Sequence, residues 1–390
     1  MNHASSLRRL ALCAATTLCL QFSPAARAGA DWEIDAHPCP GPSRTDAMQL
    51  DADGTLWVGC GTNTNGLGLF VSPDGGDNWQ AVTTSPADMV DEFRVMTLTR
   101  GHDGALYAGG VDTTAGTNLR VVRLDTSGPM PYPTTATLTS VPQVGRQFNV
   151  GNYVELSDGR ALADSETGFD RLYRPDALTG SSAADWDAPA TGLEQFQDLV
   201  AFDEGFYAAG SRINIAPRVF LPPQTPGSEP WQLVEVILDA SYDGEMWGIA
   251  VNAQRVVAVG VDQDNDTGKI YVSGNDPYNA NDYTVFDLPD IVGDGGFGTW
   301  ARGVCMRNDT IVVVGERQPL GTNTGRVMIS TDGGQSFSNI TPTPSAESVS
   351  RCAIASDGEV TVVGAGGFVG RYRGALVPDR IFSSRFEPGG

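Results

Sequence analysis

The sequence predicts an all-β fold: a seven-bladed β-propeller of four-stranded blades, with the N-terminal strand closing the last blade. Three observations predict it. A hairpin motif recurs seven times along the 390 residues, an aromatic residue that opens a short strand also recurs seven times, and the first aromatic residue precedes the first hairpin. A period of about 50 residues is typical of propeller blades, which bury their faces only against neighbouring blades.

Each hairpin combines a short apolar strand, a tight turn and a second apolar strand, which ends in glycine in every copy but the third, where Ala163 stands. In the first copy, Asp53 and Gly54 form the turn and Gly59 ends the second strand. Short β-rich runs joined by such turns favour antiparallel hairpins. We expect the last glycine to let the chain turn where a side chain would obstruct it. The seven copies occupy residues 48–59, 96–109, 154–163, 199–210, 249–260, 304–315 and 352–364.

The aromatic series predicts how the ring closes. Its first member precedes the first hairpin, and no member follows the last hairpin. We therefore expect the strand at 32–34 to be the outermost strand of the last blade, next to 368–372. This closure removes an exposed sheet edge. The seven aromatic residues are Trp32, Trp79, Tyr132, Trp186, Trp231, Tyr283 and Phe337.

The N-terminus has the pattern of a secretory signal peptide. Arg8 and Arg9 precede an apolar run at 10–20, and small residues follow before position 30. The paired arginines fit general export or twin-arginine export. No later apolar stretch reaches the roughly 18 residues of a membrane helix. We expect a signal peptide at 1–30, one propeller at 31–374, a C-terminal tail at 375–390, and a secreted or periplasmic location.

The charge of the chain limits its partners. It has 25 Lys and Arg residues against 47 Asp and Glu residues, a formal net charge of −22. Such a surface repels nucleic acid and anionic lipid, whereas a protein or carbohydrate ligand is compatible with it. With three histidines, neither a His-rich zinc site nor a Ser-His-Asp triad is expected. We expect a monomer. Calcium is the one cofactor that the sequence leaves open.

Four cysteines follow the signal peptide, as expected of an exported protein with two disulfides. Cys39 lies between the closing strand and the first hairpin, and Cys60 ends that hairpin, so we expect these two to pair. Cys305 and Cys352 occupy near-equivalent positions in adjacent blades. They form either a second disulfide or two buried thiols.

Two turns match the pattern Ser-x-Asp-x-Gly-x-x-aromatic. In this pattern the aspartate accepts hydrogen bonds from the amides of its own turn, the glycine takes a positive φ, and the aromatic ring is buried between sheets. The matching residues are Ser72, Asp74, Gly76 and Trp79, and then Ser330, Asp332, Gly334 and Phe337.

This motif resembles the Asp-box, or BNR repeat, of sialidase-type propellers. Its Asp-Gly-Gly-x-x-Trp form at 74–79 is also similar to the propellers of photosystem assembly factors and sortilin-like receptors. The resemblance implies a propeller in which the motif connects the third and fourth strands of a blade, away from the ligand face. It specifies no ligand.

Propellers usually bind ligands on the face formed by the loops that lead into the innermost strands. The resemblance to sialidases implies that three arginines could bind a substrate carboxylate there, and that Tyr242 with Glu245 could perform the chemistry. Alternatively, the arginines are ion-pair partners on an acidic chain. The candidates for this face are Arg94, Arg302, Arg351, Glu245, Tyr242, Trp247 and Trp300.

One loop has alternating aspartates, Asp262, Asp264 and Asp266. Carboxylates in such a pattern are how proteins gather oxygen ligands around calcium; the alternative is a solvated hairpin loop. The sequence thus leaves two functions open: an exported scaffold that binds a protein or glycan, and a glycoside hydrolase of the sialidase type. The sequence alone does not decide whether the protein is an enzyme.

Overall fold

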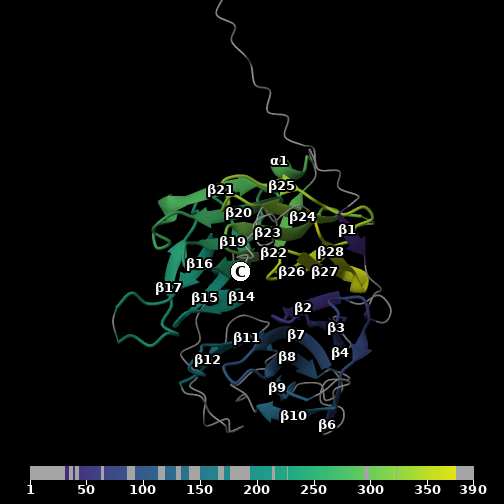
Figure 1. Ribbon diagram of the computed structural model, residues 1–390. Helices are drawn as coiled ribbons and strands as arrows, with labels where there is room; N and C mark the ends of the chain where they lie inside the picture. Colours follow the sequence, from purple (N-terminus) through teal and green to yellow (C-terminus); the bar gives the residue numbers. More distant parts are fainter. Residues whose placement is uncertain are drawn as a thin grey trace, which may run out of the picture.

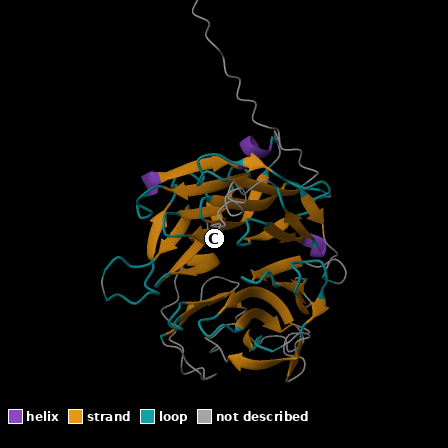
Figure 2. Ribbon diagram, viewed as in Figure 1, coloured by secondary structure: helices purple, strands orange, loops and turns teal. Residues whose placement is uncertain are grey.

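The described part of the chain is built almost entirely of antiparallel strands arranged around a centre (Figures 1 and 2). The computed structural model describes residues 31–34, 38–39, 44–62, 66–85, 93–112, 119–128, 133–139, 150–165, 171–175, 194–212, 216–225, 227–293, 298–321 and 323–374. The expected signal peptide, the tail, Tyr132 and Trp186 lie outside these residues. Within them, no helix has the length and apolar character needed to cross a membrane.

The strands of the first half of the chain form four sheets. The first sheet has β2 (Arg44–Leu50), β3 (Leu56–Gly61), β4 (Gly66–Ser72) and β5 (Gln80–Ala81). The second has β6 (Thr83–Ser85), β7 (Phe93–Arg100), β8 (Leu106–Asp112), β9 (Leu119–Leu124) and β10 (Pro133–Thr139). The third has β11 (Val150–Glu155), β12 (Ala161–Ser165) and β13 (Arg171–Arg174), and the fourth has β14 (Glu194–Phe202), β15 (Gly205–Arg212), β16 (Pro217–Leu221) and β17 (Val234–Ile237).

The second half forms two more sheets. The fifth has β18 (Gly244–Val251), β19 (Val256–Asp262), β20 (Thr267–Ser273), β21 (Tyr283–Asp287), β22 (Thr299–Arg307), β23 (Thr310–Arg317), β24 (Gly325–Ser330) and β25 (Ser338–Asn339). The sixth has β26 (Val349–Ile354), β27 (Val360–Gly364), β28 (Val369–Tyr372) and β1 (Trp32–Ile34). Short helical turns are η2 (Ala280–Asp282), α1 (Leu288–Val292) and η3 (Ala365–Gly367).

The number and size of the sheets differ from the prediction of seven four-stranded blades. The described strands form six sheets, because β20 and β22 pair in parallel at one position, Thr267 with Thr299. That pair merges the units β18–β21 and β22–β25 into one sheet of eight strands. The second sheet has five strands, since β6 adds to β10, and the third has three within the described residues.

The first strands of the successive antiparallel units contact one another around the centre (Figure 1). In contact order they are β2, β7, β11, β14, β18, β22 and β26, and β26 in turn contacts β2. The core lies between neighbouring sheets. Trp57 of β3 packs in one cluster with Leu106 of β8, and Val312 of β23 packs in another with Val362 of β27. Each sheet is therefore buried by its neighbours.

The N-terminal strand completes the last sheet, which confirms the predicted pairing. β1 runs antiparallel to β28, with Trp32 opposite Tyr372 and Ile34 opposite Gly370. The Trp32 ring lies 5.2 Å from that of Tyr372. Its indole N–H donates a 2.6 Å hydrogen bond to the carbonyl of Ile340, which follows β25. The Trp32 side chain of β1 thus contacts both β28 and the antiparallel unit β22–β25.

The glycine of the repeated hairpin has a different role from the one the sequence suggested. Gly260 and Gly315 lie inside β19 and β23 without a positive φ. The facing innermost strand bulges beside each of them, between Met246 and Gly248 and between Ala301 and Gly303. A Cβ at either glycine would overlap a backbone carbonyl oxygen of the bulged strand. The glycine therefore accommodates a β-bulge rather than a change of chain direction.

The two Ser-x-Asp-x-Gly turns form the expected hydrogen bonds. The Ser72 hydroxyl donates to Asp74 over 2.7 Å and accepts from the Gly76 N–H, also at 2.7 Å. Asp74 accepts from the backbone and side-chain amides of Asn78 at 2.9 and 2.7 Å. These bonds, from Asn78 first and Ser72 second, lower the pKa of Asp74 to about 2. The turn connects β4 to β5, a third strand to a fourth.

The second turn, between β24 and β25, repeats this geometry. Ser330 donates to Asp332 over 2.7 Å and accepts from the Gly334 N–H at 2.8 Å. Gly76 and Gly334 have φ values of 126° and 84°, as expected. Trp79 is half-buried, and Phe337 packs edge-on against Phe286 with ring centroids 5.2 Å apart. Both motifs therefore build structural turns at the outer strands.

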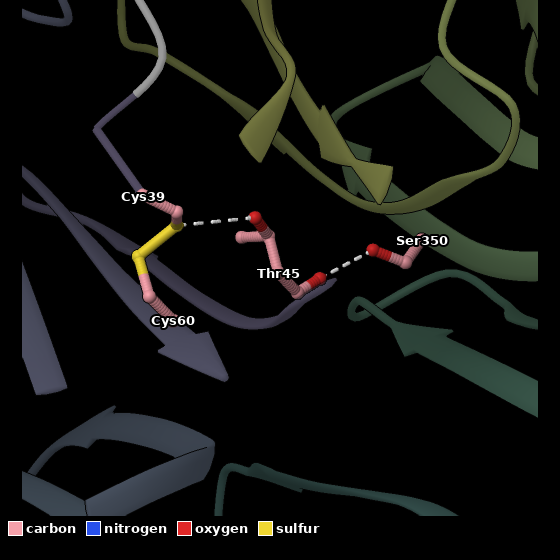
Figure 3. Close-up of a disulfide and its surroundings, with 4 residues drawn as sticks. All are labelled: Cys39, Thr45, Cys60 and Ser350. Atoms are coloured by element: carbon pink, nitrogen blue, oxygen red, sulfur yellow. Dashed lines mark hydrogen bonds between the residues drawn. A yellow bond between two sulfur atoms is a disulfide. The ribbon is translucent and has the colours of Figure 1, made fainter. Parts of the chain in front are cut away.

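Two disulfides are present, and the first is the predicted pair. Cys39 and Cys60 pair with a Cα–Cα distance of 5.5 Å, and the Cys39 sulfur lies 3.7 Å from the Thr45 hydroxyl (Figure 3). The Thr45 carbonyl accepts a hydrogen bond of 2.5 Å from Ser350 of β26 (Figure 3). This disulfide is thus adjacent to the junction of the first and last sheets.

The second disulfide joins two innermost strands. Cys305 of β22 and Cys352 of β26 pair with a Cα–Cα distance of 5.7 Å, across 47 residues of sequence. Of the two alternatives that the sequence left open, the structure has the disulfide and not the buried thiols.

Replacing Trp32 tests the closure of the ring. We expect Trp32→Ala to lower the free energy of unfolding by about 3 kcal/mol, because it removes a large packed ring and its hydrogen bond. Trp32→Phe keeps most of the packing and should cost only about 1 kcal/mol. Urea denaturation measures both. Equal stability of the alanine variant and the wild type would show that β1 does not close the ring.

The Asp332 turn should make stability depend on pH. Burial raises the pKa of Asp332, but hydrogen bonds from Ser336 and Ser330 outweigh it and lower the pKa from 3.8 to about 2. A carboxylate with a lowered folded pKa stabilises the fold above its unfolded pKa, and this contribution is lost as the pH falls through its folded pKa. We expect Asp332→Asn to cost about 1 kcal/mol at pH 7, and the cost to disappear near pH 2.

The exposed Asp309 is the matched control for Asp332. Its side chain is 63% exposed, so we expect Asp309→Asn to change the stability by less than about 0.5 kcal/mol. Denaturation of the three proteins between pH 2 and pH 7, a range set by the lowered folded pKa of about 2, provides the comparison. A constant difference between Asp332→Asn and the wild type across that range would refute the assignment.

Candidate ligand-binding site

The innermost strands enclose a central cavity of about 380 Å³. Every one of these strands contributes to its wall, so the cavity belongs to the ring as a whole and not to one sheet. One residue from each strand, in chain order, is Ala47, Met96, Asn152, Asp198, Ile249, Val304 and Arg351.

A β-bulge recurs at the same place in all seven innermost strands. The register shifts lie between Thr45 and Ala47, Val95 and Thr97, Val150 and Asn152, Phe196 and Asp198, Met246 and Gly248, Ala301 and Gly303, and Val349 and Arg351. Bulges re-aim side chains and are frequent next to binding sites. The bulge residues with described side chains differ in chemistry: Met96, Gln197, Trp247, Arg302 and Ser350.

Two of the bulge residues, with a third predicted residue, form an aromatic and cationic cluster. The Arg302 guanidinium lies 4.1 Å from the centroid of the Trp247 ring and 4.8 Å from that of Trp300. The two indoles are themselves 5.3 Å apart. An arginine over tryptophan faces is a favourable cation–π arrangement. The sequence placed all three residues on one face, and the structure brings them together.

A buried carboxylate balances the charge of Arg302. Glu316 on β23 has a side chain only 1% exposed, and its Oε1 accepts from the Arg302 Nε at 2.9 Å and Nη2 at 2.5 Å. Gln318 donates to the same oxygen over 3.0 Å, and Ser348 donates to the other. Arg302 is therefore an ion-pair partner within the fold, the alternative that the sequence had left open.

Glu245 and Tyr242 are also engaged within the protein. Glu245 accepts a 2.8 Å hydrogen bond from the indole N–H of Trp247. The Tyr242 hydroxyl is hydrogen-bonded to that of Tyr271. Burial, and then the neighbouring Tyr271, raise the pKa of Tyr242 far above its ordinary value. A phenol in this state is protonated at neutral pH and is a poor nucleophile.

The three arginines of the sialidase hypothesis lie in different settings. Arg302 belongs to the cluster with Glu316. Arg94 on β7 is 9% exposed and does not line the cavity, whereas Arg351 does. Among the described residues, one of the three arginines therefore lines the cavity. The arrangement that would bind a substrate carboxylate with three guanidinium groups is not formed around this cavity.

Sequence reasoning missed the second charged residue beside Arg351, which is Asp198. Asp198 and Arg351 each directly follow a bulge, at equivalent places in β14 and β26. One Asp198 oxygen accepts a 2.9 Å hydrogen bond from the Ile249 N–H. Burial raises the pKa of this carboxyl, and the charge of Arg351 acts in the opposite direction. The equivalence of the two positions within the repeat is the sequence signal that relates Asp198 to Arg351.

The aspartates of the loop at 262–266 contact groups of the protein itself. Asp262 turns back on its own loop and accepts from the N–H groups of Asp264 and Asn265 at 3.1 and 3.2 Å. Asp264 accepts instead from the Asp243 N–H. No three His, Cys, Asp or Glu side chains in the described ranges gather as metal ligands. The alternating aspartates, Asp266 included, therefore shape a hairpin loop.

Comparison with known proteins yields structural similarity alone. No family model matches the chain, and no curated protein matches it. A YCF48 structure with a bound D1 peptide is 15% identical over 88% of this chain and 96% of its own, with a TM-score of 0.57. YCF48 from Cyanidioschyzon merolae is 14% identical over 88% and 99%, with a TM-score of 0.59. A streptogramin B lyase is 13% identical over 89% and 99%, also with a TM-score of 0.59.

These likenesses define the class of protein: the chain is an all-β protein with the β-propeller fold. At such low identity they establish the fold and not an activity.

Removing Arg302 tests the cluster. We expect Arg302→Ala to lower the free energy of unfolding by about 3 kcal/mol, because it leaves the buried Glu316 without its cation. Arg302→Ala combined with Glu316→Gln should recover part of that loss. Arg373 is the control, since its side chain is 54% exposed and pairs with Glu33 and Glu359. We expect Arg373→Ala to cost less than about 1 kcal/mol. Similar losses for Arg302→Ala and Arg373→Ala would contradict this role of Glu316.

Proposed function

We propose that this protein is an exported, seven-bladed Asp-box propeller that binds a segment of another protein at the rim of its central cavity. The ring of bulged strands supports this proposal most directly. A single scaffold position, repeated around the ring, carries side chains that differ from strand to strand. Such variety on a regular frame suits recognition of an extended, irregular ligand more than one chemical step at one point.

The order of contacts among the innermost strands supports the proposed count of seven blades. Seven strands contact one another in a closed cycle, and each begins an antiparallel unit. If the eight-stranded sheet is divided at the Thr267–Thr299 pair, it contributes two of these units. The hydrogen-bonded Ser-x-Asp-x-Gly turns, placed between third and fourth strands, support the Asp-box class.

Export is supported by the two disulfides and by the predicted signal peptide. Disulfides persist in oxidising compartments and are rare in reducing ones. The acidic composition of the chain is favourable for solubility in such a compartment. A secreted or periplasmic location is consistent with all three observations.

A protein ligand is favoured over a glycan by the geometry of the tryptophans. Glycans stack on free indole faces, but Trp247 and Trp300 both contact the Arg302 guanidinium. One structurally similar YCF48 propeller has a bound peptide. The net charge of −22 favours a ligand with basic residues. For hydrolysis of the sialidase type, the described residues supply no supporting arrangement of carboxylates and arginines.

A binding screen tests the proposal. The purified protein is applied to a random peptide array and to a glycan array, and bound sequences are ranked. We expect retention of Lys- and Arg-containing peptides, weakened by salt, and at least tenfold weaker binding by Trp247→Ala. Trp231→Ala, a half-buried tryptophan near the outer strands of the fourth sheet, is the matched control. Retention of glycans alone, or full peptide binding by Trp247→Ala, would overturn the proposal.

A further inference from the structure

The central cavity has four charged side chains in its wall, and two of them are fully occupied. Arg100 donates through Nε to Asp51 at 2.8 Å. Glu155 accepts from Arg174 at 2.7 Å and lies 3.0 Å from His102 Nδ1. These two groups are therefore neutralised by the protein itself, and they leave no charge for a ligand.

The other two charged side chains are Asp198 and Arg351. Asp198 accepts a backbone N–H from Ile249 but makes no ion pair with any described residue. Arg351 donates to the Ser350 carbonyl over 3.1 Å, and it also makes no ion pair within the ranges that the structure describes. The two groups influence each other electrostatically without touching. A carboxylate and a guanidinium thus border the same cavity, each without a direct counter-ion.

Charges removed from bulk water need partners. A carboxylate attracts an ammonium group, and a guanidinium binds a carboxylate with two parallel hydrogen bonds. A ligand that carries both groups on one carbon atom would therefore pair with both residues at once. Aliphatic side chains also line the wall, among them Leu199, Ile249 and Val304. A volume of about 380 Å³ is at the small end of ligand pockets.

We infer that the central cavity binds a small zwitterion of the α-amino-acid type with an apolar side chain, its carboxylate on Arg351 and its ammonium on Asp198. The inference does not rest on the proposed peptide binding at the rim of the cavity, because it uses different residues and a different ligand. It assigns the cavity to a free amino acid rather than to the protein segment bound outside it.

Calorimetric titration of the purified protein tests this inference with three probes. L-leucine carries both charges, N-acetyl-L-leucine lacks the ammonium, and L-leucinamide lacks the carboxylate. We expect leucine to bind and each derivative to bind at least tenfold more weakly. No heat of binding for leucine, methionine or valine up to their solubility limits would overturn the inference. Equal binding of leucine and its two derivatives would also overturn it.

Two variants assign the ends of the ligand. Asp198→Asn should weaken leucine at least tenfold and leave N-acetyl-L-leucine unchanged, whereas Arg351→Gln should weaken leucine and leave L-leucinamide unchanged. The exposed Arg373→Gln is the control and should bind leucine as the wild type does. If either cavity variant fails to fold, the comparison of the three probes on the wild-type protein still tests whether the cavity binds a zwitterion. Peptide retention in the array screen is unaffected by any of these outcomes, so the two proposals can fail separately.

Discussion

The pairing of β1 with β28 is the contact on which the rest of the structure depends. Each sheet is buried only by its neighbours, so a ring left open would expose two sheet faces and a strand edge. Trp32 secures this junction by stacking near Tyr372 and donating to Ile340. The disulfide of Cys39 with Cys60, and the bond from Ser350 to Thr45, lie beside it. The central cavity exists because these contacts hold the innermost strands in a circle.

The features that could be predicted from sequence are those that a repeat makes visible. The two interleaved series indicated the hairpins and the closing strand, and equivalent positions in adjacent blades indicated the disulfide of Cys305 with Cys352. The role of Gly260 was not visible, because the close approach of a bulged neighbouring strand is a property of paired strands and not of one segment. The merging of two units likewise depends on a pairing between the first residues of β20 and β22, Thr267 and Thr299, which belong to different copies of the repeat.

The site was harder to predict than the fold, since side-chain partners decide whether a charge is free. Arg302 and Arg351 looked alike in sequence, yet one is paired with the buried Glu316 and the other borders the cavity. Asp262 looked like a calcium ligand, but its oxygens satisfy amides of its own turn. Asp198 had no motif at all; only its place after a bulge relates it to Arg351. In each case the deciding partner comes from another strand or from the local backbone.

The closing strand also sets the order in which this fold can form. β1 is among the first described segments to leave the ribosome and β28 among the last, and Trp32 bonds a residue 308 positions away in sequence. Contacts of such long sequence separation form slowly, because the entropy of closing the loop is lost before the contact stabilises anything. The first sheet must therefore wait, with one face uncovered, until synthesis of the last one is finished. The ring therefore closes only after translation. Until then, the uncovered face of the first sheet needs protection from other apolar surfaces.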